Sequence, residues 1–88
     1  MAFFIGMFFV YIIYSPQLDQ FYIGQTQNLE DRLFRHNNSG SKSTKKAKDG
    51  VLKYTESFLT RMEAVQRETQ IKKMKSRSYI DSLVSSAG

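Results

Sequence analysis

The 88-residue sequence contains no cysteine, no tryptophan and only one histidine. The lack of cysteine excludes disulfide bonds, thiolate zinc sites, iron–sulfur clusters and cysteine nucleophiles. The single histidine, His36, excludes a metal site built from several imidazoles. Any metal bound by these residues must therefore rest on carboxylates and water, which favour a hard cation such as Mg²⁺.

The sequence also lacks an apolar run long enough to span a membrane. Its most apolar stretch, residues 1–14, is shorter than the ~20 residues of a transmembrane helix. It has neither the basic start nor the small-residue cleavage site of a signal peptide. We therefore expect an intracellular, cytoplasmic protein without a membrane partner. In the alternative, residues 1–10 anchor the chain to a membrane surface, but their Phe, Ile and Val favour a strand over an interfacial helix.

The composition fits one folded, basic domain. Seven Phe, five Tyr and 41% hydrophobic residues exclude a disordered chain. The length suffices for one domain and not for two. Lysine and arginine number 13 against 8 acidic residues, which gives a net charge of +5. Such an excess suits a polyanionic partner, nucleic acid first and an anionic membrane second, although many basic proteins bind neither.

Three short runs of β-prone residues predict a small, mostly antiparallel sheet. Residues 8–14 and 20–24 are rich in Phe, Ile and Tyr, and turn residues that include Pro16 separate them as in a hairpin. The first run is almost wholly apolar, so we expect it to be buried on both faces. Residues 51–58 alternate weakly and predict the third strand.

Caps and apolar spacing predict three helices. Asn28 is a suitable N-cap for a helix over residues 29–38. Thr60, with a glutamate three residues later, forms a capping box that opens a helix reaching about Met74. Residues 76–84 have the apolar spacing of a last, short helix.

The order ββαβαα predicts a single α/β (α+β) domain, with a three-stranded sheet flanked by helices. The domain covers residues 1–88. Within it we expect an apolar tail at residues 1–6, a basic loop at 40–50 and a frayed end at 85–88. The tail either extends the first strand or packs on a partner subunit.

One acidic residue breaks the apolar pattern of the second predicted helix. The apolar face of this helix runs through Ala64, Val65 and Ile71, and Glu68 lies near the middle of it. A charge there is costly unless it is paired or bound to a metal. The pattern leaves open a glutamate at the rim, an ion pair with an arginine, and a metal ligand.

Arg32 and His36 flank the apolar seam of the first predicted helix. They therefore point toward the surface on which that seam packs, which we take to be the hairpin with its tyrosines. Other interpretations stay open, because basic side chains often lay their stems on a core and strand tyrosines often serve only packing.

Taken together and in order, these positions resemble the GIY-YIG nuclease family. Phe9-Val10-Tyr11 and Tyr22-Ile23-Gly24 resemble the two half-motifs, with Phe where the first has Gly. The stretch from Asn28 to Arg32, followed by His36, is similar to the family's helix with its Arg and His. Glu68 and the residues after it are similar to the helix with the metal-binding Glu. In size the chain resembles stand-alone relatives of the N-terminal nuclease domain of the UvrC repair endonuclease.

The resemblance implies a metal-dependent DNA endonuclease, nicking or structure-selective, that acts in repair or recombination. It implies that Glu68 holds a single Mg²⁺ or Mn²⁺ and that Arg32 binds the scissile phosphate. Tyr11 is implied as general base, which requires nearby cations, since a tyrosine hydroxyl loses its proton only at high pH. Tyr22 and His36 would orient water and phosphate. The implied motif residues are Val10, Ile23 and Gly24.

One position departs from the UvrC pattern. In UvrC a lysine stands three residues after the tyrosine of the second half-motif. This sequence has Gln25 at that position, which supplies no positive charge. Either Lys42 or Lys45 replaces it, or turnover is slow, or the protein binds without cutting. A catalytically idle nucleic-acid-binding module on the same fold is therefore the alternative function.

The basic loop at residues 40–50 and the lysines at the end of the second predicted helix are expected to contact phosphates beside the site. Solvated loops and helix C-termini carry such lysines as well, so both interpretations stay open. No recognition-helix or zinc-finger signature is present. We therefore expect DNA as the partner, with RNA left open, and a protein partner or a homodimer that supplies specificity. The expected contacts are Lys42, Lys45, Lys46 and Lys48 in the loop and Lys72 and Lys73 in the helix.

Overall fold

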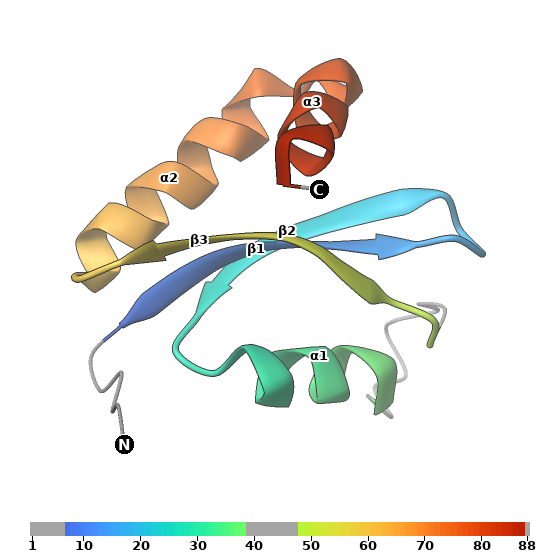
Figure 1. Ribbon diagram of the computed structural model, residues 1–88, viewed down its shortest axis with the longest axis horizontal. Helices are drawn as coiled ribbons and strands as arrows, with labels where there is room; N and C mark the ends of the chain where they lie inside the picture. Colours follow the sequence, from blue (N-terminus) through green and yellow to red (C-terminus); the bar gives the residue numbers. More distant parts are fainter. Residues whose placement is uncertain (1–6, 39–47, 88) are drawn as a thin grey trace.

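The computed structural model describes residues 7–38 and 48–87, and it shows a three-stranded antiparallel sheet between two layers of helix (Figure 1). Helix α1 covers one face of the sheet, and helices α2 and α3 cover the other. The predicted order ββαβαα is confirmed. The elements are β1 (Phe8–Ser15), β2 (Gln20–Thr26), α1 (Leu29–Asn38), β3 (Val51–Phe58), α2 (Arg61–Met74) and α3 (Arg77–Ala87).

Strand β1 lies in the centre of the sheet, between β2 and β3, and is antiparallel to both. A central strand covered by helices on both faces needs apolar side chains in both directions. Val10, Ile12 and Ile13 are accordingly buried, so the prediction of burial on both faces is confirmed. In the register of the β1–β2 hairpin, Tyr11 lies opposite Gly24.

The core on the α2 side is built around Val10, Ala64 and Ile71. Ala64 and Ile71 are seven residues apart, so they lie on one line along the helix and meet the sheet together. Val65, which the sequence places on the same apolar face, is 42% exposed, and that prediction is wrong. The reason is that Val65 is rotated by about 100° from Ala64 around the helix axis.

Two helix N-termini have the predicted side-chain caps. The Asn28 carboxamide oxygen accepts the N–H of Asp31 at 2.9 Å, and the Thr60 hydroxyl accepts the N–H of Glu63 at 3.2 Å. Lys75, in the left-handed conformation, caps the C-terminus of α2, and its N–H donates to the carbonyl of Lys72 at 3.2 Å. These local bonds explain why the predicted bounds of α1 and α2 agree with the structure.

Strand β3 has the predicted bounds, whereas the bounds of β1, β2 and α3 differ from the prediction by a few residues. Strand β1 includes Ser15, and β2 continues to Thr26 because its last residues still pair with β1. Helix α3 continues to Ala87, so positions 85–87 are helical where the sequence predicts a frayed end. The predicted apolar tail and most of the basic loop lie outside the described residues. In the described part of the chain, no helix is long and apolar enough to cross a membrane.

We expect Thr60→Ala to lower the free energy of unfolding by about 1 kcal/mol, because it removes the side-chain acceptor at the start of α2. Thr69→Ala is the matched control, since Thr69 is exposed within the same helix and alanine is the better helix former. Urea unfolding followed by circular dichroism measures both. Equal stability of the two variants would contradict the prediction.

Candidate functional site

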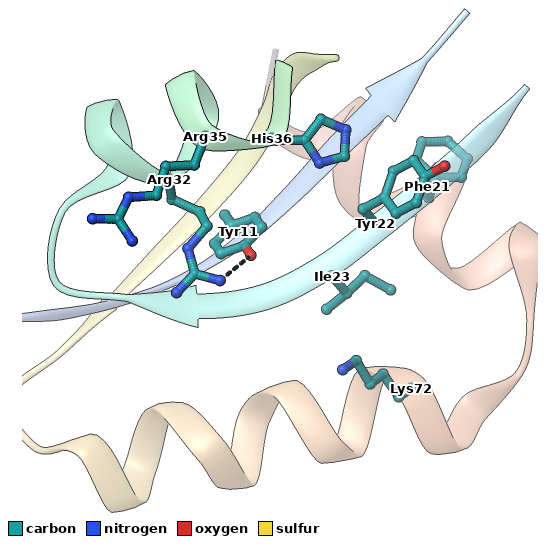
Figure 2. A pocket seen from close by; sticks show the side chains of 8 residues that line it. All are labelled: Tyr11, Phe21, Tyr22, Ile23, Arg32, Arg35, His36 and Lys72. Carbon is teal, nitrogen blue, oxygen red and sulfur yellow. Dashed lines mark hydrogen bonds between the residues drawn. The ribbon is translucent and has the colours of Figure 1, made fainter. Parts of the chain in front are cut away.

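A cavity of about 640 Å³ lies at the β2 edge of the sheet (Figure 2). Because side chains alternate along a strand, neighbouring residues of β2 point to opposite faces, and the cavity follows the edge from one face to the other. It therefore collects side chains from α1, from the β1–β2 hairpin and from α2. The lining residues are Tyr11, Phe21, Tyr22, Ile23, Arg32, Arg35, His36 and Lys72.

Tyr11 and Arg32 meet in this cavity. The Tyr11 side chain comes from the central strand and is only 7% exposed, whereas Arg32 is exposed on α1. Arg32 Nη1 donates to the Tyr11 hydroxyl oxygen at 3.5 Å. A bond of this length is weak, so both groups can also contact a further ligand. The structure thus brings together the hairpin tyrosine and the guanidinium that the sequence singles out.

Gly24 makes room for the Tyr11 ring. A Cβ at position 24 would lie 2.7 Å from Tyr11 Cζ and closer still to the hydroxyl oxygen. Real Cβ atoms essentially never come this close to a non-bonded heavy atom, so any larger residue displaces the tyrosine. The glycine of the second half-motif therefore sets the position of the tyrosine of the first.

His36 is held beneath the sheet by the start of β3. It is 8% exposed, and its ring packs edge-on against Tyr22 with 4.7 Å between ring centroids. A Cβ on Gly50 would lie 2.6 Å from His36 Cδ2, so a larger residue there would collide with the ring. The Asn37 carboxamide accepts the N–H of Gly50 at 2.7 Å and donates to its carbonyl at 3.0 Å. The end of α1 and the start of β3 thus fix His36 beside Tyr22.

Asp49 ties the chain before β3 to the hairpin turn, a link that the sequence does not reveal. Its carboxylate accepts the Ser15 hydroxyl at 2.7 Å and the N–H of Gln17 at 2.8 Å. The hydrogen bond from Ser15 lowers the pKa of Asp49, and partial burial raises it. The hydrogen bond is the larger effect, so the pKa of Asp49 lies below its usual value. The hairpin turn is therefore anchored to the segment that positions His36.

Glu68 is not among the residues that line the cavity. Its Oε2 lies 2.6 Å from Lys72 Nζ, one helical turn further along α2. Of the alternatives that the sequence leaves open, the structure shows an ion pair, and its partner is a lysine rather than an arginine. Since Lys72 itself lines the cavity, Glu68 adjoins the cavity through that lysine.

The other predicted phosphate contacts do not share this surface. Lys73 lines a different hollow, beside Val65 and Met74. Lys48 is exposed before β3, outside the lining of the cavity. Lys42, Lys45 and Lys46 lie outside the described residues. Only Lys72 of the predicted lysines therefore has a described place in the cavity.

The lining of the cavity suits an anion. Arg32, Arg35 and Lys72 are basic, and none of the described residues that line it is acidic. Sequence reasoning missed Arg35, although its spacing of three residues from Arg32 places it on a neighbouring part of the helix surface. Guanidinium groups match the geometry of phosphate oxygens, so the cavity is suited to a phosphate ester.

A divalent cation would have few protein ligands here. Within residues 7–38 and 48–87, no three His, Asp or Glu side chains are grouped as a metal site. Next to the cavity, Glu68 offers a single carboxylate, and water would complete the shell. This donor set fits Mg²⁺, which keeps most of its waters when it binds through one or two carboxylates.

Comparisons with known proteins find a family model, relatives and a solved structure that match most of this chain. The model of the family described as "GIY-YIG catalytic domain" matches residues 7–80. A UPF0213 protein of Staphylococcus haemolyticus is 40% identical over 65 residues, 73% of this chain and 78% of that protein. A UPF0213 protein of Staphylococcus saprophyticus is 37% identical over 65 residues, again 73% of this chain and 78% of that protein. The solution NMR structure of a UPF0213 protein from Bacillus halodurans has a TM-score of 0.57 and 29% identity, and the match covers 90% of this chain and 83% of that one.

Proposed function

Because this chain belongs to the GIY-YIG catalytic domain family, we propose that it is a metal-dependent endonuclease that hydrolyses phosphodiester bonds in DNA. The observation that carries the proposal is the contact between Arg32 and Tyr11 in a cavity lined by cations. The guanidinium is suited to binding a phosphate, and the tyrosine oxygen, once deprotonated, to accepting a proton. They lie within 3.5 Å of each other, close enough to act on the same phosphate.

We assign roles in this hydrolysis to four of the residues that line the cavity. A water oxygen forms a bond to phosphorus as the bond to the 3′ oxygen breaks. Tyr11 would act in its deprotonated form, since only a phenolate oxygen can accept the proton of that water, and the leaving 3′ oxygen would take a proton from solvent. Arg32 binds the phosphate oxygens, on which negative charge increases in the transition state. His36 and Tyr22, packed on each other, orient the water and the phosphate.

Glu68 is the residue that would hold a Mg²⁺ or Mn²⁺ ion beside the cavity. When bound, such a cation would polarise the phosphate as a Lewis acid and stabilise the leaving oxygen. We expect a single, weakly held ion, because one carboxylate is available and Lys72 already contacts it.

Lys72 compensates for the missing lysine at position 25. Gln25 pairs with Val10 and so shares its side of the sheet, the side that α2 covers. Its carboxamide oxygen is buried without a hydrogen-bond partner among the described residues. Lys72 approaches the cavity from α2, on the same side, and provides the positive charge that Gln25 does not.

The cellular role that fits this site is strand nicking or structure-selective cleavage in DNA repair or recombination, with RNA as a possible further substrate. Arg32, Arg35 and Lys72 in the cavity are suited to backbone phosphates, and the sequence carries no recognition-helix signature. Specificity would therefore come from a protein partner or from a second copy of the chain.

Nicking of supercoiled plasmid in Mg²⁺ or Mn²⁺ tests the proposal. We expect the wild type to form open circles, and Arg32→Ala and Glu68→Gln to reduce the rate by about 10²-fold or more. Lys53→Ala is the control for lost charge, since Lys53 is exposed on β3 outside the cavity. Glu68→Gln should fold like the wild type, because an ion pair one turn apart on a helix contributes little.

A catalytically idle nucleic-acid-binding module is the second candidate. The ion pair between Lys72 and Glu68 favours it, because the carboxylate that would hold the cation is already neutralised. Binding of plasmid by the wild type without cleavage in either cation would establish this alternative and reject the nuclease.

A further inference from the structure

Lys72 contacts Glu68 and also lines the cavity of Tyr11 and Arg32. Its ammonium lies 2.6 Å from Glu68 Oε2, and its side chain is among those that line the cavity (Figure 2). It also lines a second hollow, of about 470 Å³, together with Lys75 and other residues around the α2–α3 junction. Lys72 therefore links the carboxylate to the surface that is suited to phosphates.

The two side chains of this ion pair differ in solvent exposure. The Glu68 side chain is 20% exposed, whereas the Lys72 side chain is 53% exposed on a flexible stem of four carbons. An ion pair of this kind on a helix surface contributes little stability. The ammonium can therefore move to a new partner at low cost, while the carboxylate stays in place.

We propose that Lys72 is a positioning residue that couples the binding of a divalent cation to the binding of a backbone phosphate. Lys72 neutralises Glu68 until a phosphodiester in the cavity attracts the ammonium, and the carboxylate then accepts the cation. Two positive groups close to one carboxylate repel each other, so the lysine and the cation compete. Binding free energies are reciprocal, so a bound cation equally releases Lys72 to the phosphate. This inference rests on the role proposed above for Glu68.

Mn²⁺ binding without nucleic acid, followed by electron paramagnetic resonance, tests the competition. We expect Lys72→Met to bind Mn²⁺ about five- to tenfold more tightly than the wild type, because the competing charge is gone. Lys73→Met, one residue along, should equal the wild type, and Glu68→Gln in the Lys72→Met background should abolish the gain. Equal affinity of Lys72→Met and Lys73→Met would overturn the proposal, as would a gain that persists without the Glu68 carboxylate.

DNA binding in the presence of a chelator tests the release of Lys72 without any metal. Glu68→Gln and Glu30→Gln each remove one negative charge, but only Glu68→Gln frees the lysine. We expect Glu68→Gln to bind a short duplex more tightly than Glu30→Gln, and this excess to vanish in the Lys72→Met background. Equal affinities of the two variants would overturn the coupling. Failure of the proposed function would appear separately, as a wild type that does not nick plasmid.

Discussion

Gly24→Ala is expected to reduce plasmid nicking by about 10²- to 10³-fold while the protein stays folded. The new methyl group would lie 2.7 Å from Tyr11 Cζ and closer to the hydroxyl oxygen. Since β1 and β2 are fixed by their pairing, the ring rather than the backbone has to move. The hydroxyl then leaves Arg32, and the site loses its proposed base without the loss of any polar atom.

A mutant cycle with Tyr11→Phe tests whether Gly24 acts through the tyrosine. If it does, the double variant nicks no more slowly than Tyr11→Phe alone, because effects of residues that act as one unit do not add. Removal of the hydroxyl also relieves the closest contact, so Gly24→Ala should cost less stability in the Phe background. Independent losses that multiply in the double variant would contradict this account.

Much of the fold follows from local sequence signals. Asn28 and Thr60 cap helices through bonds within three residues of themselves, so their positions fix the helix starts. The apolar run of β1 identifies the central strand because only a strand covered on both faces needs it. The ordered half-motifs then identify the hairpin that carries Tyr11, and the helix pattern identifies Arg32.

Other features depend on contacts between distant segments, which no local pattern reveals. The place of Gly24 beneath Tyr11 follows from the strand register. The two hydrogen bonds between the Asn37 side chain and the Gly50 backbone join segments separated by residues outside the described part of the chain. The partner of Glu68 is four residues away, yet the sequence offers several basic residues nearby and only the structure selects Lys72.

The largest feature that the sequence does not reveal is an ion-pair network centred on Arg67. Its guanidinium donates to both carboxylate oxygens of Glu56 on β3, with contacts of 2.9 Å to each, and to the Tyr79 hydroxyl on α3 at 3.0 Å. The Arg67 and Glu56 side chains are 19% and 23% exposed. The network therefore joins α2, α3 and the sheet at one point on the face opposite α1.

We expect Arg67→Met to lower the free energy of unfolding by about 2–3 kcal/mol, because Glu56 keeps a half-buried charge without its partner. Glu56→Gln in the same background should restore much of the loss, since it removes that charge. Arg35→Met is the control, because its pair with Asp31 is far more exposed and should matter much less. Urea unfolding measures all four proteins, and a double variant no more stable than Arg67→Met would contradict the charge-based explanation.

The same network predicts a dependence on pH. Burial alone would raise the pKa of Glu56, but the hydrogen bonds from Arg67 and Tyr54 outweigh it and hold the pKa below the usual 4.5. A carboxylate with a lowered pKa stabilises the fold above its unfolded pKa and loses that contribution as the pH falls through its folded value. The stability difference between the wild type and Glu56→Gln should therefore be constant near neutral pH and shrink on acidification below 4.5. Urea unfolding across that range measures it, and a difference that grows in acid would mean that Glu56 is protonated in the folded protein.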